Sequence, residues 1–553
     1  MDFEQLNQLV IEQFECSKQK KSYYCCLKEI SADELLDGLL GFGLFAEKIP
    51  PFLTAEIFLN FCKTPPSGFV FDESEKRFIH YESMRNINVP RVLAIPNPIA
   101  YYNQCKVLSN NWDKLIVYFQ KQTHNQKHKI SRVHIRKIDD TFKVFNTCYQ
   151  DLDDINLDDY PSLVQNHLFE MNHKNFCTDD YPEPNLLIGK RYIVKADISN
   201  CFPSIYTHSL SWALVGKKEA KEKSKPIHRN EWFNQIDFYT RNLKDGETHG
   251  ILIGSHASNL ISEIILTAID KTMYDKGYRY IRNIDDYTCY VETKEKAEIF
   301  LVELSTELKQ YGLMLNHKKT EILKLPLAST EHWVRKLNSF VFSNNDKLKL
   351  SEVRAYLDIS LDLMFHNKEN SAILNYAIKV LAKKEMTGNA KDYFIKTVHH
   401  LVLLYPYLVS LLDDKIFTVF SIDKSKIEKI TRDLFQLGDS KKLYEAMSYT
   451  LFFSLKYDFL LTENLFEKVE NSHDAILLLL AYLHDKKFLN SSNNFNRTTI
   501  GKKYRNLALS LLSDIDEYWI FVYEVLTAGN LKAEWKQMKQ TNLTFLKDEY
   551  KGS

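Results

Sequence analysis

Four features are missing from this 553-residue sequence, and together they limit the class of protein. Its longest apolar stretches, 401–412 and 475–483, are shorter than the roughly 18 to 20 residues that a membrane helix needs, so we expect no transmembrane span. The N-terminus is acidic and amphipathic, without the basic region and long apolar core of a secretory signal. We therefore expect a cytoplasmic location.

The third absence is a cysteine framework. The nine cysteines form no C-x-x-C element, and an odd, scattered set favours reduced thiols over disulfides or a zinc site. The sequence also has no net charge, because Lys plus Arg equals Asp plus Glu at 72 each. The overall charge therefore gives no argument for a nucleic-acid partner. Basic stretches at 121–137 and 217–229 surround an acidic one at 151–159. Such runs are most often solvated surface, and the alternative is that they follow a phosphate backbone.

The length and the apolar periodicity predict several domains, about two to four by length alone. Strand and helix patterns alternate from 190 to 325, and the clearest helix follows His256 and ends before Gly277. Beyond about residue 350, helix follows helix without a β-pattern and without a fixed sequence period. We predict an α+β chain divided into 1–189, 190–345 and 346–553, of which the last part is all helical.

The most informative motif is the acidic pair Asp285 and Asp286 in the segment YRYIRNIDDYTCYV. The same dipeptide occurs five more times, at 139/140, 153/154, 158/159, 179/180 and 413/414, in apparent loops or solvated faces. Only at 285/286 do β-branched and aromatic residues flank the pair on both sides, which is typical of a hairpin. The pair is therefore predicted at the tip of two adjacent strands.

A third carboxylate, Asp197, ends the apolar run 192–196. Alternation directs Val194 and Ala196 to the core and Asp197 to the opposite face. Nucleotidyl transfer uses two divalent ions about 3.5 to 4 Å apart, and Mg²⁺ is commonly held by one or two carboxylates with phosphate oxygens and water. We therefore expect Asp197, Asp285 and Asp286 to hold two ions, Mg²⁺ or Mn²⁺, in a polymerase-like palm.

Four segments, in order, resemble the motifs of reverse transcriptases. DISNCFPSIY resembles motif A, GILIGSHASNL motif B, NIDDY motif C and YGLMLNHKKTEIL motif D, and the match covers roughly residues 80 to 330. Upstream, Arg91 in RVLAIPNP resembles the arginine of the fingers. The resemblance implies a right-hand fingers-palm polymerase that synthesises DNA from dNTPs.

The resemblance also implies roles for individual residues. Asp197 and Asp285 would bind the metal ions with the main-chain carbonyl of Ile198, and Asp286 would support them. Phe202 would exclude a ribose 2′ hydroxyl; without the resemblance it would count as a core residue.

Further roles follow for residues that contact the nucleotide. Arg91 would hold the triphosphate by charge-assisted hydrogen bonds. Lys319 would protonate or stabilise the departing pyrophosphate; alone it would count as solvated surface. Gly254 and Ser258 preserve the G-x-x-x-S spacing of motif B, where glycine lets the backbone approach the nucleotide closely.

Two positions depart from the usual motifs. Ile253 stands where most reverse transcriptases carry glutamine, and Asn283 where an aromatic residue is usual. The sequence resembles the abortive-infection (Abi) and defence-associated reverse transcriptases of bacteria in these departures, in the segment ADISNCFPSIYTHSLSWALVG and in its all-helical C-terminal half. In that branch a HEAT-like helical-repeat domain takes the place of the thumb.

This narrower resemblance implies further expectations. Some members make DNA without a conventional template, primed from a protein hydroxyl, assemble as higher oligomers and protect cells against phage. For this chain it implies dNTP substrates, a DNA product covalently attached to protein, a homo-oligomer and a noncoding RNA as a candidate partner. If the protein primes synthesis itself, Tyr23 and Tyr24 in SKQKKSYYCC are the candidates, and an ordinary role in the N-terminal lobe is their alternative.

Two other functions remain open. A ribonucleotide-using palm, either RNA-synthesising or a nucleotidyl cyclase, shares the carboxylates, and Phe202 argues against it. A relict palm that serves as an RNA- or protein-binding scaffold is the alternative from another class. The presence of all three carboxylates argues against that scaffold.

Overall fold

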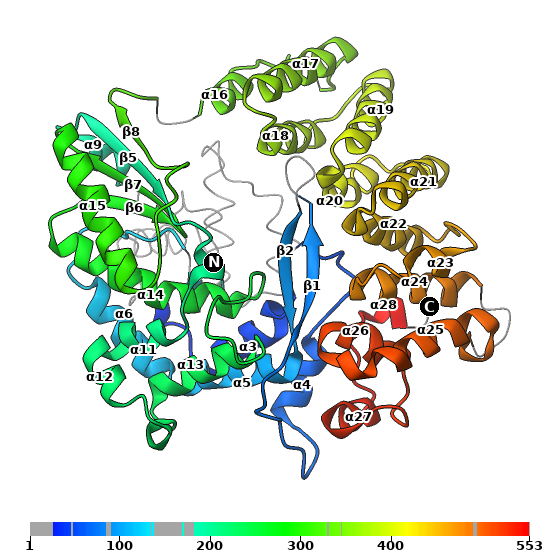
Figure 1. The fold of residues 1–553 in the computed structure, drawn as a ribbon. Helices are drawn as coiled ribbons and strands as arrows, with labels where there is room; N and C mark the ends of the chain where they lie inside the picture. The colour runs from blue at the N-terminus through cyan, green and yellow to red at the C-terminus, as the bar shows by residue number, and fades with distance from the viewer. Residues whose placement is uncertain are drawn as a thin grey trace, which may run out of the picture. The chain divides into compact units, whose positions relative to one another are not determined.

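The computed structural model describes residues 26–45, 48–84, 90–133, 135–137, 169–170, 182–328, 331–343, 346–489 and 495–551 (Figure 1). The chain divides into two compact units. The first comprises Met1–Phe45, Ala55–Phe78 and Ile95–Leu327, and the second comprises Ala46–Thr54, Ile79–Ala94 and Ala328–Ser553. Tyr23 and Tyr24 lie outside the described residues.

The first unit contains a four-stranded antiparallel sheet in the order β6-β7-β5-β8 (Figure 1). Its strands are β5 (Tyr192–Asp197), β6 (Tyr280–Asn283), β7 (Asp286–Val291) and β8 (Glu321–Lys324). The register pairs Asp197 with Asp286 and Asn283 with Asp286. The sheet thus brings the ends of three strands together at one edge.

Helices α14 (His256–Asp275) and α15 (Lys294–Gln310) pack against one another, and α15 packs on β5 and β7. Val194 and Ala196 are buried, together with their cross-strand partners Cys289 and Tyr287. Because neighbours across antiparallel strands share a face, these residues form the core face of the sheet. Asp197 has the opposite parity, as the sequence predicts.

The remaining elements of the first unit are mostly helices. Gly277, predicted to stop the helix after His256, follows α14 with a φ of +96°. The described elements are α3 (Ala32–Gly43), α4 (Glu56–Lys63), α5 (Pro98–Asn110), α6 (Trp112–Thr123), β3 (Arg136–Lys137), β4 (Phe169–Glu170), α9 (Glu183–Leu187), α10 (Cys201–Ser204), α11 (His208–Val215), α12 (Lys217–Glu222), η3 (Pro226–His228) and α13 (Trp232–Asn242).

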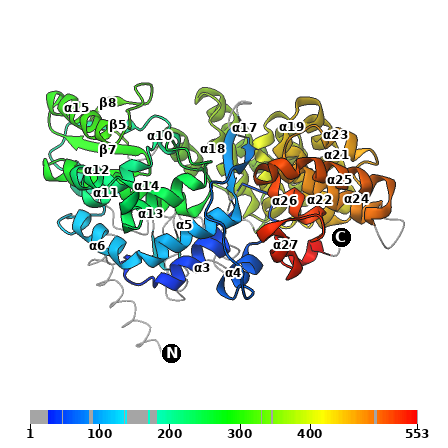
Figure 2. The same ribbon diagram turned by 60° about the horizontal axis from the view of Figure 1, so that its bottom comes forward.

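The strand pair β1 (Phe78–Ser83) and β2 (Arg91–Pro96) carries residues of both units. In the second unit, neighbouring helices from α19 to α26 lie side by side; they follow one another in Figure 1 and form one cluster in the turned view of Figure 2. Its helices are α16 (His332–Asn338), α17 (Leu350–His366), α18 (Ser371–Ala382), α19 (Gly388–Leu404), η4 (Pro406–Leu408), α20 (Val409–Leu411), η5 (Leu412–Phe417), α21 (Lys424–Lys441), α22 (Tyr444–Tyr457), α23 (Leu465–Val469), α24 (Ala475–Phe488), η6 (Phe495–Arg497), α25 (Thr499–Ser510), η7 (Leu511–Asp514), α26 (Ile515–Val525), α27 (Ala533–Gln540) and α28 (Asp548–Lys551).

The apolar run of α24 forms the centre of this helical series. Every residue from Ala475 to Asp485 is buried, since α22, α23, α25 and α26 contact this helix. The described part of 328–553 contains no strand, so the α+β chain with a helical C-terminal part is confirmed. Among the described helices, none combines the length and apolar character needed to cross a membrane.

Candidate active site

The acidic hairpin has a two-residue turn, Ile284 and Asp285, between β6 and β7. Asp286 therefore begins β7 instead of standing in the turn itself. Ile284 has a φ of +55°, a left-handed conformation that is rare for a β-branched residue. The backbone N–H of Ile198 donates to the carbonyl of Asp285 at 3.1 Å, which ties the end of β5 to this turn. The three predicted carboxylates thus share one edge of the sheet.

Arg282 supports the turn from the core face. Its side chain is 0% exposed, and its guanidinium donates to the carbonyl of Ile284 at 2.7 Å. It also forms ion pairs with two acids of α14, Glu263 at 2.8 Å and Asp270 at 2.6 Å. All three charged side chains are buried, so each depends on the others for compensation. We call Arg282, Glu263 and Asp270 the buried triad.

Asp197 is 4% exposed, and each of its carboxylate oxygens accepts a hydrogen bond. Asn316 Nδ2 donates to Oδ1 at 2.8 Å, and Lys319 Nζ donates to Oδ2 at 2.7 Å. The hydrogen bond to Asp197 raises the pKa of Lys319 above its ordinary value. The ammonium group of Lys319 therefore compensates the negative charge of Asp197 in this structure.

Asp286 lies among other negatively charged side chains at the tip of the hairpin. Desolvation and the neighbouring charges of Asp285 and Asp197 raise its pKa to about 6, while Lys319 opposes the shift. Like charges at close range disfavour ionisation of every member, and a bound cation relieves that repulsion. The electrostatics of the tip therefore favour a positively charged ligand.

Motifs A and B lie next to one another in the first unit. Phe202 is half-buried on α10, directly after β5, and its carbonyl accepts a hydrogen bond from the N–H of Ile251 at 2.9 Å. Gly254 has a φ of +130°, a conformation that L side chains rarely adopt. Ser258 is buried in the first turn of α14, and its hydroxyl lies 3.0 Å from that of Ser255.

Comparison with known families decides the class of this unit. Residues 121–350 match the family model described as "Reverse transcriptase (RNA-dependent DNA polymerase)". This segment is a reverse-transcriptase domain. The sheet with Asp197, Asp285 and Asp286 lies within it.

Solved structures of telomerase also show similarity. Apo telomerase from Candida tropicalis truncated from the C-terminal domain is 14% identical over 50% of this chain and 56% of its own, with a TM-score of 0.26. The untruncated apo telomerase is 12% identical over 78% of this chain and 69% of its own, with a TM-score of 0.28. This chain thus spans little more than half the length of the first. The scores are too low to add to the family match, and no curated protein matches the chain.

Arg91, predicted to hold the triphosphate, begins β2 within the second unit. Arg91 lies outside the segment 121–350 that matches the reverse-transcriptase family, and its role in binding the triphosphate remains a prediction. The predicted priming residues Tyr23 and Tyr24, outside the described residues, likewise remain predictions.

The donor set of the reverse-transcriptase domain fits a divalent cation in its chemistry. Carboxylate and carbonyl oxygens are the ligands that Mg²⁺ prefers, and the raised pKa of Asp286 reports charge that a cation would compensate. In the described part of the chain, however, no three His, Cys, Asp or Glu side chains are arranged as a ready metal site. Once the ion pair between Lys319 and Asp197 is broken, the ions would be held by Asp197, Asp285, Asp286 and the carbonyl of Ile198.

The sequence did not identify Asn316 or the buried triad. Glu263 and Asp270 lie seven positions apart on the face of α14 opposite its apolar stripe, where charged side chains are usual, so neither carries a signal. The signal for the triad is Arg282, which has the parity of the core residue Tyr280. Asn316 carries no comparable signal, since asparagine is common in turns.

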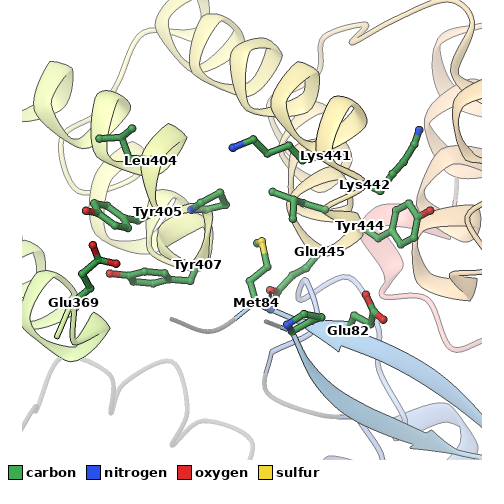
Figure 3. Close-up of a pocket in the computed structure, with 13 residues that line it drawn as sticks. Glu82, Met84, Glu369, Leu404, Tyr405, Tyr407, Lys441, Lys442, Tyr444 and Glu445 are labelled. Atoms are coloured by element: carbon green, nitrogen blue, oxygen red, sulfur yellow. Dashed lines mark hydrogen bonds between the residues drawn. The ribbon is translucent and has the colours of Figure 1, made fainter. Parts of the chain in front are cut away.

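The second unit contains a cavity of about 350 Å³ (Figure 3). Tyr405 and Tyr407 stand on one side and Glu445 on another. Glu445 accepts hydrogen bonds from the Ser83 hydroxyl at 3.1 Å and the Met84 N–H at 2.5 Å, and burial raises its pKa to about 7. None of the residues expected from the motifs lines this cavity.

Proposed function

We propose that the reverse-transcriptase domain synthesises DNA from dNTPs by two-metal nucleotidyl transfer. The observation that carries the proposal is the pairing of Asp197 with Asp286 across adjacent strands, with Asp285 in the turn that precedes β7, inside a segment that matches the family. Two divalent ions at this edge would lower the barrier by activating the attacking hydroxyl and neutralising the leaving pyrophosphate.

The chain's own residues then orient the nucleotide and manage protons. The Phe202 ring, on α10 after β5, would occupy the space of a 2′ hydroxyl and so favour deoxynucleotides. Gly254 would let the main chain approach the nucleotide, since no Cβ stands in the way. Lys319 carries a proton close to the carboxylates and would transfer it to the departing pyrophosphate.

We further propose that the enzyme belongs to the defence-associated branch, acting against phage in the bacterial cytoplasm. Ile253 and Asn283 support this proposal, since both depart from the motifs of template-copying enzymes. The series of helices in the second unit also supports it. In this proposal the helices form a HEAT-like domain, the protein assembles as a homo-oligomer, and synthesis is primed by a protein hydroxyl such as Tyr23 or Tyr24. A noncoding RNA would be an additional partner if a template is used.

The test uses purified full-length protein with Mg²⁺ or Mn²⁺ and labelled dNTPs or NTPs. The proposal expects incorporation of deoxynucleotides, and sequencing of co-purifying nucleic acid before and after protease treatment would report template and priming together. Preference for NTPs would favour the ribonucleotide-using palm. Absence of any incorporation, with phage restriction retained, would favour the scaffold.

A further inference from the structure

A second cavity, of about 470 Å³, opens in the first unit between α11, α12 and α13. Its walls include the basic stretch 217–229, which the catalytic proposal leaves without a function. Neither the acidic tip nor the motif B residues line it. It therefore requires its own explanation.

Four cationic side chains line this cavity. Lys221, Lys225 and Arg229 are exposed at its rim, and Arg241 is half-buried. The guanidinium of Arg229 lies 3.9 Å from the centroid of the Phe238 ring, and that of Arg241 lies 5.2 Å from it. Stacking on one ring holds two forked donors in place, which is the arrangement that suits recognition of a phosphate.

The interior of the cavity also holds a carboxylate. Asp237 is 7% exposed, and its Oδ2 accepts a hydrogen bond from His208 Nδ1 at 2.5 Å. Within the described residues, neither the other oxygen of Asp237 nor Nε of Arg241 has a hydrogen-bond partner. Both atoms are themselves buried, and buried polar groups are rarely left unpaired.

The opposite charges of the arginines and of Asp237, all of which line the cavity, limit the class of ligand. An anion alone would satisfy Arg241 and repel Asp237, whereas a nucleotide supplies a phosphate together with N–H or O–H donors. The rings of Tyr206 and Trp212 also line the cavity, and a nucleobase stacks on such rings. Lys217 Nζ lies 4.2 Å from the centroid of the Trp212 ring, which adds a further cation beside the opening.

We propose that this cavity binds one nucleotide, with its phosphate on Arg229 and Arg241 and a donor of its base or sugar on Asp237. The nucleotide belongs either to a single strand or to a free nucleoside triphosphate, since both offer the same chemistry. The site is separate from the proposed catalytic centre and does not depend on metal ions. Its backbone connection to α10 is short, because Tyr206 follows Ser204 by two positions.

The test measures binding of a fluorescein-labelled single-stranded 12-nucleotide DNA by anisotropy and of ATP by calorimetry. It uses full-length protein carrying Asp197→Asn and Asp285→Asn, in EDTA, so that failure of the catalytic proposal does not affect it. The Arg229→Gln/Arg241→Gln variant should bind one or both ligands about tenfold more weakly, as expected for loss of charge-assisted hydrogen bonds. Loss for DNA alone assigns the site to a strand, and loss for ATP alone assigns it to a free nucleotide.

A matched control removes the same charge elsewhere in the unit. Lys294→Gln/Lys309→Gln neutralises two exposed lysines of α15, outside the cavity. Affinities of the arginine variant equal to those of this control for both ligands would overturn the proposal. If the arginine variant fails to fold, Lys221→Gln/Lys225→Gln decides, because it changes only the exposed rim.

Discussion

Lys319 Nζ lies 2.7 Å from Oδ2 of Asp197, so an ammonium group holds the position on the carboxylate that a metal ion would take in catalysis. Lysine and cation must then compete for Asp197. Lys319 therefore compensates the charge of Asp197 while no metal ion is bound, and in the proposed mechanism it is also the proton donor.

Replacing Lys319 by alanine should therefore separate metal affinity from turnover. We expect Mn²⁺ to bind several-fold more tightly, because a competing charge is gone, and incorporation to slow by about a hundredfold or more, because a general acid is lost. Mn²⁺ titration and single-turnover incorporation measure the two effects. Lys318→Ala, which removes the neighbouring exposed lysine, is the control; equal effects of both variants would contradict the role of Lys319.

Replacing Arg282 by methionine should unfold the reverse-transcriptase domain readily. Glu263 and Asp270 would remain buried without their cation, and breaking such a network destabilises a protein by about 3 to 5 kcal/mol. Urea unfolding followed by tryptophan fluorescence measures the change.

A triple variant distinguishes positioning from stability. Arg282→Met with Glu263→Gln and Asp270→Asn removes all three charges, and we expect it to recover much of the lost stability. Incorporation should stay low, because the hydrogen bond to the Ile284 carbonyl at the catalytic turn is still missing. Full activity in the stable triple variant would show that the triad only stabilises the fold.

Replacing Phe202 by alanine should relax the choice of sugar. Removing the ring opens space on α10, and the preference for dNTPs over NTPs should fall by about tenfold or more, as expected when a steric clash is removed. Competing incorporation of dGTP and GTP measures the ratio. Phe365→Ala, at an exposed phenylalanine of the second unit, should leave the ratio unchanged; an unchanged ratio in Phe202→Ala would count against the gate.

Glu445 predicts a pH dependence of stability in the second unit. Its pKa is about 7 in the folded protein, above the ordinary value of 4.5, so the folded state binds the proton more tightly than the unfolded state. The contribution is complete below about pH 4.5 and is lost as the pH rises to about 7, by up to about 3 kcal/mol.

Thermal unfolding of the wild type and Glu445→Gln between pH 4.5 and 7.5 checks this. Glutamine can keep both hydrogen bonds, to Ser83 and from Met84, so the variant should lose most of the slope without losing the fold. A smaller slope should remain, because burial also raises the pKa of Asp474, to about 6. An identical slope in both proteins would exclude Glu445 as its source.

Local patterns were sufficient to predict the frame of the site. Alternation placed Val194 and Ala196 in the core and Asp197 on the opposite face, and the apolar stripe after His256 predicted α14. These elements follow from periods of two and about 3.6 residues, which depend only on neighbouring residues.

Long-range partners could not be predicted in this way. In the sequence, Arg282 is a polar residue in a short strand, and its ion pairs with Glu263 and Asp270 are visible only in the structure. Asn316 donates to Asp197, which lies 119 positions earlier in the chain. Glu445 similarly accepts a hydrogen bond from Met84 across 361 positions. Pairings of this kind arise from the tertiary fold, so no local period encodes them.

The central claim is that Asp197 and Asp285 carry nucleotidyl transfer at one edge of the sheet. The most direct measurement compares Mn²⁺-dependent dNTP incorporation by the wild type, Asp197→Asn, Asp285→Asn and the control Asp275→Asn, which changes an exposed aspartate of α14 in the same unit. We expect incorporation by the wild type and the control, and none by either active-site variant. Incorporation at the wild-type rate in Asp197→Asn or Asp285→Asn would contradict the assignment.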